Sequence, residues 1–110
     1  MMLTEQDVVK AVKEVTLRRL RVWVKNGWIA PATGAEGPGF DGIDLARVRL
    51  VCQLKDELNL NEDAVAVVLS LMDQVYGLRR ELRTLAAAVE QQPNRVRREI
   101  VSVVQDLTKT

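Results

Sequence analysis

Apolar residues recur at intervals of three and four along most of the chain, which is the spacing of one face of an α-helix. The first such segment follows Thr4, a residue type that commonly caps helix N-termini. Its apolar face is formed by Val8, Val9 and Val12. The pattern predicts a short helix that runs to about Lys13.

A second helix is predicted from Leu17 to about Asn26, because Thr16 can cap its start and Gly27 can end it in a left-handed conformation. Its inward face is formed by Leu17, Leu20, Val24 and part of Trp23. The segment also carries four basic residues: Arg18, Arg19, Arg21 and Lys25. Two short helices joined by a tight turn predict a helix-turn-helix.

The segment WIAPATGAEGPGFDG contains too many Gly and Pro residues for a helix. Apolar anchors stand near its two ends, so it predicts a small hairpin, or wing, that is fixed to the core by Trp28, Ile29 and Phe40. Asp41 or Asp44 can cap a third helix over residues 45–58. Its expected inward residues are Leu45, Val48, Val51, Cys52 and Leu58.

A long fourth helix is predicted after Asn61, because no Pro follows until Pro93. Its apolar residues alternate at intervals of three and four, which defines a coiled-coil seam of three heptads. The seam residues are Val68, Leu71, Val75, Leu78, Leu82, Leu85 and Val89. One small domain cannot bury such a seam, so we expect a homodimer through this helix, with the helix orientation left open.

A last amphipathic helix is predicted from Arg95 to Leu107. Its apolar face is formed by Val96, Ile100, Val103, Val104 and Leu107. This face can fold back on the seam or pack on a second subunit. We therefore expect a mainly α protein: a winged helix-turn-helix core in residues 1–60, a long helix in 61–92 that completes the core and mediates association, and a C-terminal helix in 93–110.

Charge and composition exclude several classes of function. The net charge is only +1, from 16 Lys and Arg against 15 Asp and Glu, whereas dedicated DNA-binding proteins usually carry a basic excess. There is no His and one Cys, which removes most nucleophile–base pairs and most zinc sites. We expect a cytoplasmic protein that is not an enzyme, has no cofactor or metal and does not enter a membrane.

The order of these elements resembles the MerR family of regulators. Residues 4–76 are similar to its DNA-binding domain, and VTLRRLRVWVKNGWI is similar to its second helix. Val15, Leu20, Arg21 and Gly27 fall on the family pattern, whereas Trp23 replaces the usual Tyr. The resemblance implies a winged helix-turn-helix followed by a coiled-coil helix.

Residues 40–82 more closely resemble the chaperone-modulator branch, the CbpM family. The resemblance rests on Phe40-Asp41, on the pattern of Leu54, Glu57, Leu58 and Leu60, and above all on residues 66–73. It extends over residues 4–90 and does not include residues 93–110. It implies a protein that binds the J-domain of a DnaJ-like or CbpA-like co-chaperone and keeps it from its DnaK-type chaperone.

The same resemblance implies that carboxylates beside apolar contacts cover a basic helix of the J-domain. The candidate partner-binding residues are Asp56, Glu57, Glu62, Asp63, Met72 and Asp73. Solvated surface for Asp56 and Glu57, helix capping for Glu62 and Asp63, and plain core packing for Met72 remain open as alternative interpretations.

The alternative function is a dimeric DNA-binding regulator of MerR type. Arg18, Arg19, Arg21 and Lys25 would then contact phosphates and the major groove. The wing argues against this reading, because it carries Glu36, Asp41 and Asp44 and no cation lies between Asn26 and Ala46. Such a wing would be repelled by phosphates.

Overall fold

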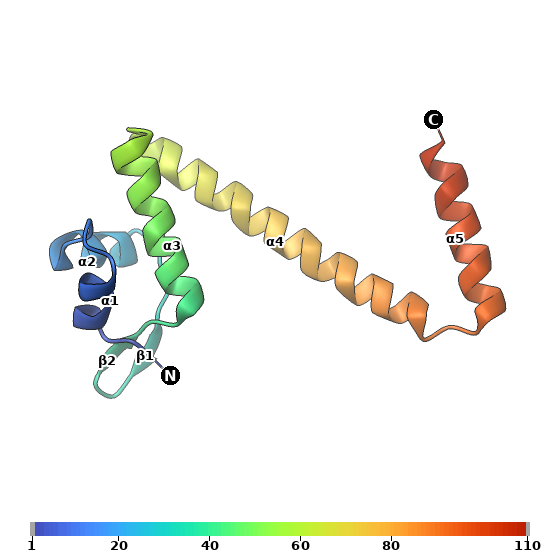
Figure 1. Ribbon diagram of the computed structural model, residues 1–110, viewed down its shortest axis with the longest axis horizontal. Helices are drawn as coiled ribbons and strands as arrows, with labels where there is room; N and C mark the ends of the chain where they lie inside the picture. Colours follow the sequence, from blue (N-terminus) through green and yellow to red (C-terminus); the bar gives the residue numbers. More distant parts are fainter. Residues whose placement is uncertain (1, 110) are drawn as a thin grey trace. The chain divides into compact units, whose positions relative to one another are not determined.

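The computed structural model describes residues 2–109 and separates into two compact units, residues 1–70 and 71–110. The first unit contains helices α1 to α3, a two-stranded hairpin and the first turns of α4 (Figure 1). The second contains the rest of α4 and the last helix, α5. The mainly helical fold expected from the sequence is confirmed.

Helices α1 (Glu5–Ala11) and α2 (Leu17–Lys25) form the helix-turn-helix. The Thr4 hydroxyl accepts a hydrogen bond from the Asp7 N–H, and the Asp7 carboxylate accepts one from the Thr4 N–H. Helix α1 ends two residues before the expected end, with Val12 already extended as its C-cap. Gly27 has a φ of 79° after α2, as its predicted role at the helix end requires.

The wing is an antiparallel hairpin of β1 (Ala32–Gly34) and β2 (Gly37–Gly39). Phe40 is fully buried at its end, and the Leu3 and Phe40 backbones exchange two hydrogen bonds of 2.7 and 2.8 Å. Trp28 and Ile29 are also buried. The predicted fixing of the wing by apolar anchors is therefore confirmed.

Two of the three acidic residues that the sequence assigned to the wing lie at the start of the third helix. Asp41 is the N-cap of α3 (Gly42–Cys52) and forms a capping box with Asp44. Both carboxylates therefore accept hydrogen bonds from backbone N–H groups at a helix start. Only Glu36 lies in the turn of the hairpin itself.

The third helix widens at its C-terminal end, which corrects one predicted core residue. Residues Gln53–Glu57 form a π-helical segment, η1, in which the Leu58 N–H donates to the Gln53 carbonyl at 3.0 Å. The wider turn rotates the Leu58 side chain away from the helix face that carries Val48 and Val51. Leu58 is consequently 63% exposed, and Leu54 is the buried residue of this turn.

Helix α4 (Glu62–Glu90) is long, as the absence of Pro predicted. Asn59 turns the chain with a φ of 56°, and the Asn61 side chain accepts from the Ala64 N–H at 2.8 Å. Val65 and Leu69 insert into the core of the first unit. Helix α5 (Asn94–Thr108) follows a three-residue link. No helix in the described chain is long and apolar enough to cross a membrane.

Candidate functional site

Arg19 holds helix α2 against the π-helical turn. Its guanidinium donates to both carboxylate oxygens of Asp56, at 3.0 and 3.2 Å, and to the Glu14 carbonyl at 2.9 Å. It also lies 4.9 Å from the ring centroid of Trp23, a cation–π distance. All of these contacts are within the protein, so Arg19 has a structural role in addition to any function.

Arg21 connects helix α2 to helix α1 in the same way. Its guanidinium donates to the two carboxylate oxygens of Glu5, at 2.9 and 3.2 Å. The hydrogen bond from Arg21 is the main reason that the pKa of Glu5 lies below its ordinary value. Two of the four basic residues of α2 are therefore already paired with carboxylates.

The other two basic residues border an open hollow of about 530 Å³ on the outer face of α2. Leu17, predicted to face the core but only half-buried, forms its apolar part together with Val22. Arg18, Arg21 and Lys25 form its basic part. Within residues 2–109 the structure records no ion pair for Arg18 or Lys25. This hollow is the part of the helix that remains available to an anion.

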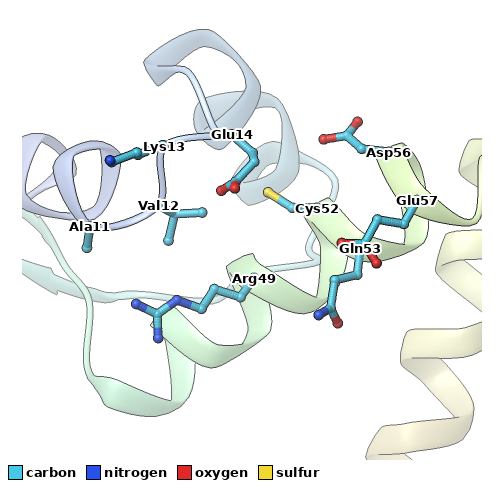
Figure 2. A pocket seen from close by; sticks show the side chains of 9 residues that line it. All are labelled: Ala11, Val12, Lys13, Glu14, Arg49, Cys52, Gln53, Asp56 and Glu57. Carbon is cyan, nitrogen blue, oxygen red and sulfur yellow. The ribbon is translucent and has the colours of Figure 1, made fainter.

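A second hollow, of about 420 Å³, lies between the α1–α2 turn and the end of the third helix (Figure 2). We call it the carboxylate groove, because Glu14, Asp56 and Glu57 contribute three of its side chains. The other residues that line it are Ala11, Val12, Lys13, Arg49, Cys52 and Gln53. Among the described residues, no ion pair is recorded for Glu14 or Glu57.

Cys52 lies at the inner wall of the carboxylate groove, with its sulfur directed toward Val12 and Glu14 (Figure 2). Burial raises the pKa of its thiol and outweighs the Arg19 charge, which lowers it, and the nearby Asp56 and Glu14 carboxylates act in the same direction as burial. The thiol therefore remains protonated and is a poor nucleophile. The predicted role of Cys52 as a small buried apolar residue is confirmed.

The structure brings together only part of the candidate partner-binding set. Asp56 and Glu57 border the groove, whereas Glu62 and Asp63 lie in the first turn of α4. Met72, half-buried, and Asp73, exposed, belong to the second unit. Glu14 was missed, because a single carboxylate in a short turn carries no local signal of what the fold places opposite it.

The seam residues of α4 lie largely on the surface. Val68 and Val89 are half-buried, and the five between them are between 47% and 65% exposed: Leu71, Val75, Leu78, Leu82 and Leu85.

The described residues contain no cluster of three or more His, Cys, Asp or Glu side chains that could hold a metal ion.

Comparison with known families fits this architecture. The family model of the MerR HTH family regulatory proteins matches residues 4–87. The chain belongs to this family. No curated protein and no solved structure matches the chain.

The segment that matches the MerR HTH family model contains two structural parts. Its N-terminal part contains the helix-turn-helix and the hairpin, and its C-terminal part contains most of α4. The last residues of α4 and all of α5 lie beyond the match.

Proposed function

We propose that this MerR-family protein is a non-catalytic modulator that binds the J-domain of a DnaJ-like or CbpA-like co-chaperone. By covering the basic helix of the J-domain, it would keep the co-chaperone from its DnaK-type chaperone. The observation that carries the proposal is the pairing of two basic residues of α2. Arg19 and Arg21 would contact DNA in a MerR-type regulator, but here they form hydrogen-bonded ion pairs with Asp56 and Glu5.

The carboxylate groove supports the same proposal. Glu14 and Glu57 line it without a recorded ion pair in the described chain, beside the exposed Ala11, although Lys13 and Arg49 line the same groove. A cationic side chain of a partner helix fits this combination, because its charged end meets carboxylates and its alkyl chain meets apolar atoms. We therefore place Glu14 beside Asp56 and Glu57 in the proposed binding surface.

Calorimetric titration of the full chain with the J-domain co-chaperone of the same organism tests the proposal. We expect binding that weakens as salt screens the charges. Glu57→Lys should lower the affinity about fivefold or more, which corresponds to about 1 kcal/mol. Glu36→Lys makes the same change of charge in the hairpin turn and should leave the affinity unchanged. An absence of binding at low salt contradicts the proposal.

A second candidate function is DNA binding, which the hollow beside Arg18 and Lys25 favours. These two cations flank exposed apolar surface on the helix that enters the major groove in helix-turn-helix proteins. A gel-shift with genomic fragments at low salt tests it. Retarded complexes that disappear in the double variant Arg18→Ala/Lys25→Ala would favour the regulator over the modulator.

We also propose that the protein is a homodimer and that the α4 seam mediates the association. The exposed Leu78, Leu82 and Leu85 support this, because a coiled-coil seam is stable only when a partner helix covers it. Sedimentation equilibrium of the full chain and of Leu82→Asp tests the dimer independently of J-domain binding.

A further inference from the structure

Helix α5 leaves its apolar face uncovered although it starts only three residues after α4. Val103, Val104 and Leu107 are between 52% and 73% exposed, and no residue of α5 is buried. Within the second unit the two helices diverge after the link (Figure 1). An ion pair of 3.1 Å between Arg97 and Glu90 joins the start of α5 to the end of α4.

The apolar residues of α5 repeat the spacing of those in α4. Leu78, Leu82, Leu85 and Val89 are separated by intervals of four, three and four, and so are Val96, Ile100, Val103 and Leu107. Both rows span 12 residues, and about 16 Å of helix separates the first residue of each row from the last. The rows are therefore matched in length and register, as two helices in a coiled coil require.

The face of α5 is wider than a two-stranded seam needs. Val104 lies beside the row, so the stripe covers about 100° of the helix surface. A stripe of this width is typical of a helix that packs between two neighbours in a bundle, whereas a two-stranded coiled coil uses the narrower row alone. A single α4 helix covers only one side of such a stripe.

The exposed apolar surface of the second unit is large enough for an interface between two copies. Ten large apolar side chains of residues 71–109 are between 47% and 73% exposed. At about 60 Å² for each, they present roughly 600 Å² per chain. A standard interface buries about 800 Å² per partner, of which about 60% is apolar, so the two quantities agree.

We propose that α5 docks on the α4 seam of a second copy of this chain, so that the dimer core contains four helices. Each copy carries both matched rows, and a two-fold axis lets each copy present α5 and receive the partner's α5. A surface that contains both complementary parts is what a symmetric dimer requires. The proposal rests on the proposed α4 dimer and assigns a role to the segment beyond the family match.

Sedimentation equilibrium of full-length variants tests this role of α5. Val103→Asp should raise the dimer dissociation constant about tenfold or more, because it places a charge in the bundle core. Gln105→Asp introduces the same side chain on the opposite face of α5 and should leave the constant unchanged. If Val103→Asp behaves as the unmodified chain while Leu82→Asp dissociates, α4 alone forms the dimer and the proposal for α5 is wrong.

Cysteine cross-linking distinguishes docking on a second copy from closure within one chain. A mixture of Leu82→Cys and Val103→Cys chains should give a disulfide-linked dimer that contains both variants. The doubly substituted chain should yield linked dimers as well. If it gives only an internally linked monomer, α5 covers its own α4 and the proposal is overturned. A full-length chain that remains monomeric overturns both the α5 role and the α4 dimer, whatever the result of the J-domain titration.

Discussion

The Arg19 guanidinium and the Asp56 carboxylate, 37 residues apart in the chain, form a two-pronged ion pair with N–O distances of 3.0 and 3.2 Å. The pair joins the helix that would read DNA to the π-helical turn that borders the carboxylate groove. The two candidate surfaces are therefore connected by one contact. The sequence indicated a DNA-binding surface for Arg19 and a J-domain-binding surface for Asp56, whereas in the structure the two side chains bind each other and stabilise the fold.

We expect Asp56→Ala to lower the free energy of unfolding by about 0.5–1 kcal/mol, because both partners are partly exposed and solvent weakens the pair. Arg19→Ala should cost more, since it also removes the contact with Trp23 and the bond to the Glu14 carbonyl. Urea unfolding of the two single variants and the double variant measures the coupling. Costs that simply add would show that the ion pair contributes nothing.

The Glu5–Arg21 ion pair should make the free energy of unfolding depend on pH. The pKa of Glu5 in the folded chain lies below its ordinary 4.5, so the carboxylate stabilises the fold at higher pH. This contribution is complete above the unfolded pKa and is lost as the pH falls through the folded pKa. Asp44 acts in the opposite direction, because burial raises its pKa and its contribution is lost as the pH rises through the folded value.

Glu5→Gln should therefore reduce the melting temperature at pH 7 and flatten its decrease between about pH 5 and pH 3. Thermal unfolding followed by circular dichroism measures both effects. Glu36→Gln is the control, because it removes a carboxylate from the hairpin turn, where no ion pair is recorded among residues 2–109. A profile of Glu5→Gln that parallels the unmodified chain would contradict the assignment.

Because of the π-helical turn, we expect substitution of two leucines four residues apart to have very different effects on stability. Leu54 is 6% exposed and Leu58 is 63% exposed. Leu54→Ala should cost about 2–4 kcal/mol of unfolding free energy, because it leaves a cavity in the core. Leu58→Ala should change it by less than about 0.5 kcal/mol. Denaturant unfolding decides, and equal costs would indicate a regular α-helix through this segment.

Gly27 should tolerate a methyl group sterically but not conformationally. No heavy atom lies within 4 Å of the place of an added Cβ, yet its φ is 79°. Gly27→Ala should destabilise the protein by about 1 kcal/mol, the cost of a left-handed alanine. Gly42→Ala is matched to it, because this position also has open space but lies in the first turn of α3. Gly42→Ala should leave the stability unchanged or raise it slightly.

The sequence by itself determined the elements with local causes. Thr4, Thr16 and Asn61 cap helices because their side-chain oxygens reach backbone N–H groups three residues away. Gly27 ends α2 because glycine adopts a left-handed conformation at little cost. The periodicity of the apolar residues likewise determined the buried faces of α1 and, in part, of α2, where Val8, Val12 and Leu20 lie in the core. It did not single out Val65 and Leu69, the buried residues of α4.

Only the tertiary structure decided which charges meet. The partners of Arg19 and Arg21 lie 37 and 16 residues away, and no local pattern connects side chains across such distances. Glu14 joined the carboxylate groove for the same reason. The π-helical turn was also invisible to periodicity, because one additional residue in a turn changes the phase of the helix without changing its composition. Local chemistry thus determined the helices, and long-range packing decided which of their polar side chains remain available to a partner.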